Sequence, residues 1–213
     1  MKARVITILE EPRSVEAAER CIKSGQSYGL DITMFKAITP KDNPTQIAED
    51  LGINTSKFNN QYSKFESCLA AFLSHRAIWQ EIYDSRTPSL IFEHDAVMTD
   101  FLPQIIKGLV VNFGKPSYGS WITPSFLGEG QLTTKRYFPG AHAYYVSPAG
   151  AFSLLEKSTE EAEPTDVYMN LDRFSFLSEI HPFKAEAKDS FTTIQVERGC
   201  IAKHRYDEDY DIL

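Results

Sequence analysis

The first forty residues alternate between apolar runs and one amphipathic segment. Residues 4–9 (RVITIL) are apolar and largely β-branched and are closed by two glutamates and a proline, which predicts a buried strand. After Ser14, a predicted helix N-cap, apolar residues recur at helical spacing until Gly25 or Gly29. A second apolar run follows at 31–38. This order predicts a βαβ unit with two parallel strands.

The middle of the chain predicts an irregular excursion and then a long helix. Residues 39–64 are rich in proline, glycine, asparagine and serine, so we expect a loop with one short helix at 45–51, a feature that often covers a ligand site. Residues 65–85 carry apolar side chains at helical spacing and give the clearest helical pattern in the chain. Trp79 on this helix is expected in the core.

The apolar run at 89–92 predicts a strand whose carboxyl end delivers Glu93, His94 and Asp95. In open α/β sheets, ligands bind at the carboxyl ends of the strands. Glu93 and Asp95 are two positions apart on an extended backbone, an arrangement that can hold a divalent cation and through it a diphosphate. The alternative is that both are solvated residues at the end of a strand.

The second half of the chain predicts shorter elements. In order, we expect a helix at 101–111, a strand at 120–123, a mobile glycine-containing loop at 126–140, a strand at 141–146 and a helix at 147–158 that begins at the N-cap Ser147. The acidic residues 207–213 predict a solvated, flexible tail. No repeat or low-complexity linker interrupts the chain, so we expect residues 1–213 to form one domain.

Composition narrows the function classes. The 213 residues carry 22 basic and 29 acidic side chains, a net charge of −7, which argues against nucleic acid as a partner. The chain has 3 cysteines, at positions 21, 68 and 200, and they match no disulfide or zinc spacing, so we expect buried thiols in a reducing compartment. No apolar run is long enough to span a membrane or serve as a signal peptide. These features predict a cytoplasmic protein without an integral membrane segment.

Four separated blocks carry a family resemblance. They are FLSHRAIWQEI with Ser74, His75 and Trp79, SLIFEHDAVM with Glu93 and Asp95, AHAYYVSPAGAFSLL with Tyr145, Ser147, Gly150 and Ala151, and EPTDVYM with Pro164 and Asp166. Their order resembles glycosyltransferase family 25, the lipooligosaccharide and procollagen galactosyltransferases. The sequence departs from the family pattern at His94, which replaces the central acid of the acidic triplet, and at Ile8 and Leu9, which replace an Asn-Leu pair.

The resemblance implies an α/β fold of the GT-A type, with a mixed, mostly parallel sheet flanked by helices. It implies transfer of a hexose, typically galactose from UDP-galactose, with inversion, to a saccharide or protein hydroxyl in lipopolysaccharide-type biosynthesis. Mn²⁺ or Mg²⁺ would be held by Asp95, Glu93 and His94 and would neutralise the diphosphate leaving group. Asp166 is the candidate base for the acceptor hydroxyl, and the neighbouring Glu160, Glu161 and Glu163 are expected to raise its pKa. The alternative is that Asp166 caps the start of a helix after Pro164.

Other residues are candidates for donor or acceptor contacts. His75 and Arg13 could bind the donor, and the cluster of Lys203, His204 and Arg205 could return to the diphosphate. The alternatives are a core position for His75, a solvated helix start for Arg13 and surface charge for the cluster. Aromatic side chains that could stack on an acceptor sugar or belong to the core are Trp121, Phe126, Tyr137 and Phe138. Two other functions use the same residues: a non-catalytic sugar-nucleotide-binding module, and a metal-dependent phosphohydrolase or nucleotidyltransferase.

Overall fold

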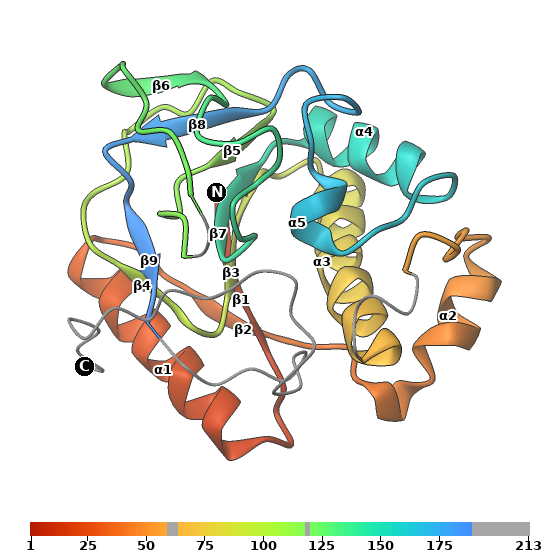
Figure 1. Cartoon of the computed structure of the whole chain (residues 1–213). Helices are drawn as coiled ribbons and strands as arrows, with labels where there is room; N and C mark the ends of the chain where they lie inside the picture. Colours follow the sequence, from red (N-terminus) through yellow and green to blue (C-terminus); the bar gives the residue numbers. More distant parts are fainter. Residues whose placement is uncertain (59–63, 118–119, 189–213) are drawn as a thin grey trace.

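A mixed sheet forms the centre of the molecule (Figure 1). The computed structural model describes residues 1–58, 64–117 and 120–188, and within these ranges seven strands form one sheet. In spatial order they are β2 (Thr33–Lys36), β1 (Lys2–Thr7), β3 (Ser89–Glu93), β7 (Ala143–Val146), β5 (Val110–Asn112), β8 (Ser178–His181) and β6 (Gly128–Gln131). All but β7 and β6 run in one direction. The predicted mixed, mostly parallel sheet is confirmed.

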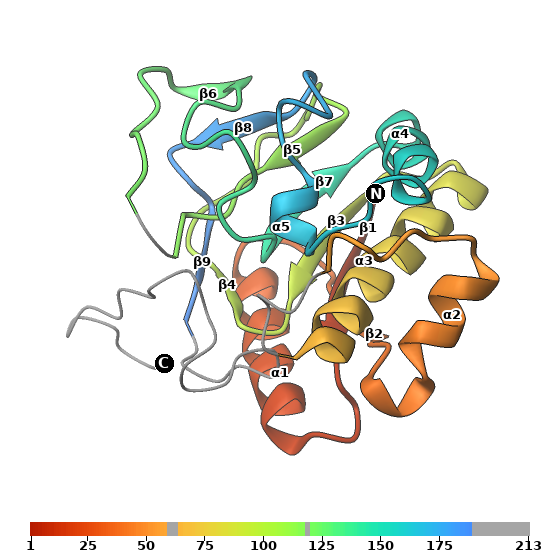
Figure 2. The ribbon, with the colours of Figure 1, turned by 45° about the vertical axis from the view of Figure 1, so that its right-hand side comes forward.

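Helices cover both faces of this sheet (Figure 2). On one face lies α1 (Pro12–Ser27), whose Cys21 packs with Val5 and Leu90 in one apolar cluster. The other face is covered by α3 (Phe65–Ser85), which packs against α4 (Pro148–Ser158), α2 (Pro44–Asp50) and α5 (Thr165–Tyr168). A short antiparallel pair, β4 (Ala96–Met98) and β9 (Ala185–Ala187), extends beside α1. The predicted α/β layering is therefore present.

Strand register brings several chain segments to one edge of the sheet. The parallel strands β1 and β3 pair Ile6 with Glu93, so both strands end there. Strand β7 is antiparallel to β3 and pairs Ala143 with Phe92, so the residues that enter β7 lie at the same edge. This register places residues from the start, middle and second half of the chain around the carboxyl end of β3.

Several predicted elements agree with the structure. The βαβ unit is present, α3 has the predicted bounds, and α2 lies within one residue of its predicted position. Cys21 and Cys68 are buried thiols, and Trp79 is fully buried. In the described part of the chain, no helix is long and apolar enough to cross a membrane. Cys200 and the tail 207–213 lie outside the described residues.

The predicted N-cap of α1 is wrong. The helix begins at Pro12, and Glu11 caps it by accepting a hydrogen bond from the Arg13 N–H (3.3 Å). Proline at the first helical position has a suitable φ and needs no hydrogen-bond partner for its nitrogen. Ser14 is therefore inside the helix and buried. The helix continues to Ser27, and Gly29 follows it with a positive φ of 76°.

The predicted helix at 101–111 is absent. This segment is irregular and ends in β5, because Pro103 lacks a backbone donor and the Glu129 carboxylate binds the N–H groups of Lys107 and Gly108. The predicted strand at 120–123 is also absent, although the Ile122 N–H donates to the Thr134 carbonyl (3.0 Å). The predicted loop 126–140 instead contains strand β6, which pairs with β8.

The N-cap of α4 provides a test of local stability. Ser147 Oγ accepts a hydrogen bond from the Gly150 N–H (3.1 Å). We expect Ser147→Ala to lower the free energy of unfolding by about 0.5–2 kcal/mol, because a helix N–H loses its partner. Urea denaturation measures this change. Ser153→Ala, at a half-buried position of the same helix where the hydroxyl caps no N–H group, is the matched control, and an equal effect of both substitutions would contradict the capping role.

Candidate active site

The centre of the candidate site is the turn between β3 and β4, which holds Glu93, His94 and Asp95. Glu93 is the last residue of β3, and its N–H donates to the carbonyl of His142 (2.9 Å) at the entrance to β7. The sheet thus fixes the backbone of this turn from the β7 side. The three side chains then contact different elements.

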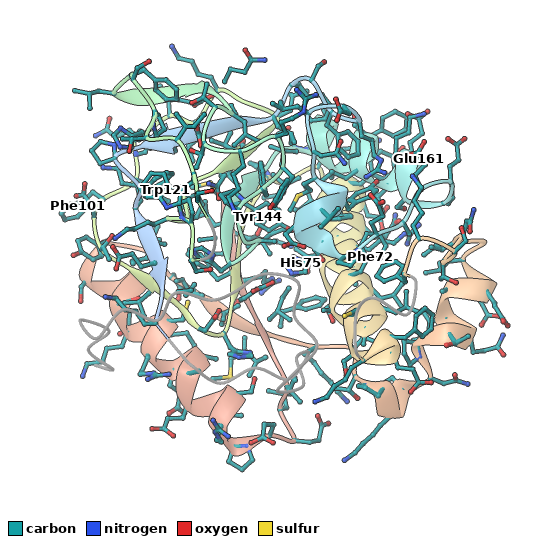
Figure 3. All side chains as sticks on the ribbon, viewed as in Figure 1. Phe72, His75, Phe101, Trp121, Tyr144 and Glu161 are labelled. Carbon is teal, nitrogen blue, oxygen red and sulfur yellow. The ribbon has the colours of Figure 1, made fainter. Side chains whose placement is uncertain are left out.

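A buried chain of hydrogen bonds supports Glu93. Figure 3 labels two members of this chain, His75 on α3 and Tyr144 on β7. His75 Nε2 lies 3.2 Å from Glu93 Oε1, and His75 Nδ1 lies 2.8 Å from the Tyr144 hydroxyl. Trp79 Nε1 donates to the same hydroxyl (3.0 Å). Because indole nitrogen can only donate, Tyr144 accepts from Trp79 and can donate its own proton to His75 Nδ1. His75 then carries its proton on Nε2, and this N–H donates a hydrogen bond to the Glu93 carboxylate.

This network keeps the Glu93 carboxylate charged. Burial raises the pKa of Glu93, but the hydrogen bond from His75 and the electrostatic effect of the surrounding imidazoles outweigh it and hold the pKa below its ordinary value. The Glu93 side chain is still 36% exposed, whereas the His75 side chain is 2% exposed. An ionised carboxylate therefore faces outward on a buried support. It can accept hydrogen bonds from a hydroxyl or contact a cation.

The Ser-His pair on α3 connects two strand ends. Ser74 Oγ accepts a hydrogen bond from the Ile38 N–H just beyond β2 (2.8 Å) and donates to the Ala70 carbonyl (2.8 Å). The next residue, His75, contacts Glu93 at the end of β3. The pair therefore sets the position of α3 against the carboxyl edge of the sheet. His75, predicted as a donor-binding residue, acts in the described structure as the support of Glu93.

His94 and Arg13 lie near the start of α1. His94 Nδ1 is 3.2 Å from Ser14 Oγ, which also accepts a hydrogen bond from the Ile8 N–H (2.9 Å). Ser14 therefore links the end of β1 to the turn after β3. Arg13, the preceding residue, is exposed at this same end of α1. The structure thus brings Arg13 and His94, both predicted as site residues, to neighbouring positions.

Asp95 faces the α1 side of the turn. Its Oδ1 atom is buried, and its charge adds to the effect of burial in raising the pKa of the Cys21 thiol on α1. Its backbone carbonyl accepts a hydrogen bond from the Lys188 N–H (2.9 Å). Asp95 is half-buried as a residue, so the acidic turn has one carboxylate on the α3 side and one on the α1 side.

The resemblance to family 25 implies a divalent metal ion at the acidic turn. Among the described residues, no group of three or more histidine, cysteine or acidic side chains is arranged to hold an ion. His94 already uses Nδ1 toward Ser14, so only its Nε2 could serve as a ligand. Mg²⁺ is usually held by one or two carboxylates together with substrate phosphates. Because Glu93 and Asp95 lie on different sides of the turn, the donor chemistry fits a site in which one carboxylate holds the ion and the diphosphate completes the coordination.

His142 is a site residue that the sequence analysis missed. Its ring is fully buried, and burial lowers the pKa of His142 although Glu93 opposes this effect. The ring fills the space beside Gly114, where a Cβ would come within 2.4 Å of Nε2. A side chain at position 114 would therefore displace the histidine. A single histidine at the start of an apolar strand gives no signal in the sequence that could reveal this contact.

Asp166 lies in the first turn of α5, where its Oδ1 accepts a hydrogen bond from the Val167 N–H (2.9 Å). Burial lowers the pKa of Lys135, and the negative charge of Asp166 opposes this effect only in part. The short helix is anchored near the Glu93 support because the Tyr168 ring stacks on Trp79 (5.7 Å between centroids). Tyr168, two residues after Asp166 in α5, thus connects this short helix with the network that supports Glu93.

The acidic cluster expected around Asp166 is corrected by the structure. Arg173 donates to Glu161 (2.9 Å) and Glu163 (3.0 Å), and Lys157 lies 3.5 Å from Glu160. The hydrogen bonds and charge of Arg173 lower the pKa of Glu161. These carboxylates are therefore compensated by cations and do not form the mutually repelling cluster that was predicted. Sequence proximity misled because Arg173 is ten or more residues away along the chain.

The block with Tyr145, Ser147, Gly150 and Ala151 is structural. Val146 pairs with Ser89 at the amino end of β3, so the block lies at the edge opposite the acidic turn. A Cβ on Gly150 would come within 2.3 Å of the Leu109 carbonyl oxygen, which explains glycine at this position. This block therefore sets the packing of α4 rather than the chemistry of the site.

The remaining candidates separate into core and surface. Phe138 is fully buried and packs on Tyr144 (5.8 Å between centroids). Trp121 is half-buried, and Tyr137 lies beneath the Lys135 ammonium (5.4 Å). The Phe126 ring occupies the space above Gly130. Lys203, His204 and Arg205 lie outside the described residues.

Comparison with known protein families identifies the group to which this architecture corresponds. The model of glycosyltransferase family 25, described as an LPS biosynthesis protein, matches residues 12–118, half of the chain. The chain belongs to glycosyltransferase family 25. No curated protein matches the sequence significantly. A solved structure of CTP:phosphocholine cytidylyltransferase from Streptococcus pneumoniae is similar at 11% identity, with 86% of this chain and 91% of that chain covered and a TM-score of 0.40.

The residues that match the family 25 model contain only part of the candidate site. Residues 12–118 include Arg13, the Ser74-His75 pair and the whole acidic turn. Tyr144, His142 and Asp166 lie beyond the matched residues, although Tyr144 and His142 contact the turn or its support. In this glycosyltransferase family 25 chain, the unmatched half therefore supplies part of the same site.

The Tyr144 hydroxyl provides a test of the supporting network. We expect Tyr144→Phe to lower the free energy of unfolding by about 1–3 kcal/mol, because the Trp79 N–H and His75 Nδ1 both lose a buried partner. Urea denaturation measures the change. Tyr145→Phe, the next residue of β7 on the opposite face of the sheet, is the control. Equal stability of Tyr144→Phe and the unmodified protein would show that the hydroxyl does not support the network.

Proposed function

We propose that this family 25 protein transfers a hexose, with galactose from UDP-galactose as the expected case, to a hydroxyl group of a saccharide. The observation that carries the proposal is the ionised, outward-facing Glu93 carboxylate on its buried support of His75, Tyr144 and Trp79, at the carboxyl end of β3. Ligands of open α/β sheets bind at this edge. The family description suggests a lipopolysaccharide or related glycan as the source of the acceptor.

In this proposal Glu93 and Asp95 both bind the donor, in different roles. Asp95, together with phosphate oxygens of the donor, would hold Mn²⁺ or Mg²⁺, and Glu93, on the α3 side of the turn, would accept a hydrogen bond from a ribose hydroxyl. When bound, the cation supplies neutralisation of the charge that develops on the departing nucleoside diphosphate. His75 keeps Glu93 ionised and fixed in orientation, so that the donor meets a preorganised carboxylate.

The start of α1 provides the opposite side of the donor site. Arg13 is exposed beside His94, where its guanidinium can donate to a phosphate. Ser14 fixes the His94 ring, so its Nε2 can donate to a phosphate oxygen or serve as a ligand of the cation. The buried thiols Cys21 and Cys68 support a reducing setting for the protein, as in the cytoplasm.

Asp166 is the proposed base for an inverting transfer. It would accept the proton of the acceptor hydroxyl while that oxygen attacks the anomeric carbon and the bond to the diphosphate breaks. Its support comes from the short helix α5, which Tyr168 holds against Trp79, and from Lys135, whose positive charge interacts with it.

A second candidate function is donor binding without turnover. The observation that favours it is His94, which stands at the centre of the acidic triplet and is held by Ser14. Binding of UDP or a UDP-sugar without transfer to any saccharide would support this second candidate.

Metal-dependent donor binding gives the first test. We expect UDP with Mn²⁺ to raise the melting temperature of the protein, by roughly 5–10 °C at a hundred times Kd, and to have little effect on Asp95→Ala. Thermal-shift assays with and without Mn²⁺ measure this effect. Asp100→Ala, an exposed aspartate five residues further on, is the matched control and should behave as the unmodified protein. Retention of the Mn²⁺-dependent shift in Asp95→Ala would remove Asp95 from the metal site.

Asp166 gives the second test. We expect Asp166→Asn to reduce kcat about 10²–10⁴-fold with donor affinity unchanged, because the amide keeps the hydrogen bond from Val167 but cannot accept a proton. Release of UDP in the presence of acceptor measures kcat. Asp84→Asn on the exposed side of α3 is the control. Unchanged turnover in Asp166→Asn would exclude Asp166 as the base.

A further inference from the structure

A groove of about 380 Å³ lies on the part of the molecule formed by β6, β8 and the loops beside them. Its size falls within the range of small-molecule sites, about 300–1,000 Å³. One wall is the segment 120–122, the other is the segment 132–136, and Leu171 contributes from the α5 side. The groove combines apolar side chains with hydroxyl groups and two cations.

Trp121 is the main aromatic surface of the groove. Its ring packs edge-on against Phe183 (5.8 Å between centroids, 79° between planes), which restrains its orientation. The two walls are connected because the Ile122 N–H donates to the Thr134 carbonyl (3.0 Å). Trp121 is half-buried, so part of its ring is available to a ligand.

A buried carboxylate holds the opposite wall. Glu179 on β8 is 0% exposed, and its Oε1 accepts hydrogen bonds from the Thr133 N–H (2.7 Å), the Thr133 hydroxyl (2.9 Å) and the Thr134 N–H (3.0 Å). The Thr134 hydroxyl donates to Oε2. A buried charge is tolerated when hydrogen bonds satisfy it. Here those bonds fix the backbone immediately before Lys135.

The groove is connected to the candidate site through the wall formed by residues 132–136. Lys135 in the same wall interacts with Asp166, the proposed base. Figure 3 shows Trp121 and His75 on either side of Tyr144 in this view.

We propose that the groove bounded by Trp121 and the segment 132–136 binds the acceptor sugar. A pyranose ring has an apolar face of C–H groups that can pack on an indole and a rim of hydroxyl groups that can bond to threonine, serine and lysine. The donor candidates lie around β1 and β3, whereas the groove lies near β8 and β6, at the other end of the strand order. This inference rests on the proposed function, because it assigns that reaction's second substrate.

Tryptophan fluorescence tests the groove without any turnover. The chain has only two tryptophans, and Trp79 is fully buried. We expect methyl glycosides of galactose, glucose or N-acetylglucosamine, or lactose, to change the emission of the unmodified protein, and we expect Trp121→Phe to lose this change. UDP with Mn²⁺ should leave the Trp121 emission unchanged. A response to UDP in place of the sugars, or no response to any of these sugars, overturns the inference.

Steady-state kinetics with the best sugar of that panel provides the second measurement. We expect Trp121→Ala to raise the acceptor KM at least tenfold while the KM for the UDP-sugar stays within twofold. Phe152→Ala, an exposed aromatic on α4, is the control and should change neither constant. An unchanged acceptor KM in Trp121→Ala overturns the inference and leaves the proposed function standing. If sugars change the Trp121 emission but the protein binds no nucleotide, the groove is supported as a sugar site and the proposed transferase function is rejected.

Glu179 is a positioning residue in this proposal. We expect Glu179→Gln to raise the acceptor KM several-fold with kcat and the donor KM nearly unchanged, because the amide cannot accept all four hydrogen bonds. Glu129→Gln is the matched control, since Glu129 also binds two backbone N–H groups but at residues 107 and 108. If Glu179→Gln lowers only thermal stability and leaves the acceptor KM unchanged, its role is structural and the positioning role is rejected.

Discussion

The hydrogen bond between His75 and Glu93 is the contact on which the arrangement of the site depends. It joins the long helix α3 to the carboxyl end of β3, and the Tyr144 hydroxyl continues it into the core to Trp79. A charged carboxylate at the edge of a buried sheet is costly unless its hydrogen bonds are satisfied. The network satisfies Glu93 on its inner side and leaves its outer side for a ligand.

This arrangement uses the same residues for stability and for chemistry. Trp79 packs in the core against Phe72 and Tyr168, and its N–H also begins the chain of hydrogen bonds to Glu93. Tyr168 belongs to α5, which carries Asp166. The positions of the candidate base Asp166 and of the donor carboxylate Glu93 therefore both depend on one aromatic cluster. A change in that cluster is expected to move both sides of the reaction together.

The second half of the chain completes what the family-matched half begins. Residues 12–118 contain the acidic turn and its support from α3, while β7, α5 and the groove walls come from residues beyond 118. The antiparallel strand β7 connects the two, because it lies between β3 and β5 in the sheet. It places the His142 carbonyl against Glu93 and the Tyr144 hydroxyl beneath His75. Strand β7 thus supports the proposed donor site, whereas the walls of the proposed acceptor groove come from the segments on either side of β6.

The sequence alone determined the periodic elements and the acidic turn. The spacing of apolar residues predicted α3, the βαβ unit and the strand before Glu93, because local periodicity reports which face of an element is buried. It failed at 101–111, where contacts with Glu129, 21 and 22 residues away in sequence, replace the helical hydrogen bonds. It also assigned Ser14 to an N-cap, whereas Ser14 contacts His94 across the sheet edge.

Only the tertiary structure decided which candidates meet. The sequence placed Glu161 and Glu163 beside Asp166, but Arg173 pairs with both of them after the chain folds back. It showed no role for His142 or Glu179, because each acts through a partner more than forty residues away along the chain. The support of Glu93 and the shape of the groove are long-range contacts. Such contacts depend on strand order and register, which the local pattern of residues does not encode.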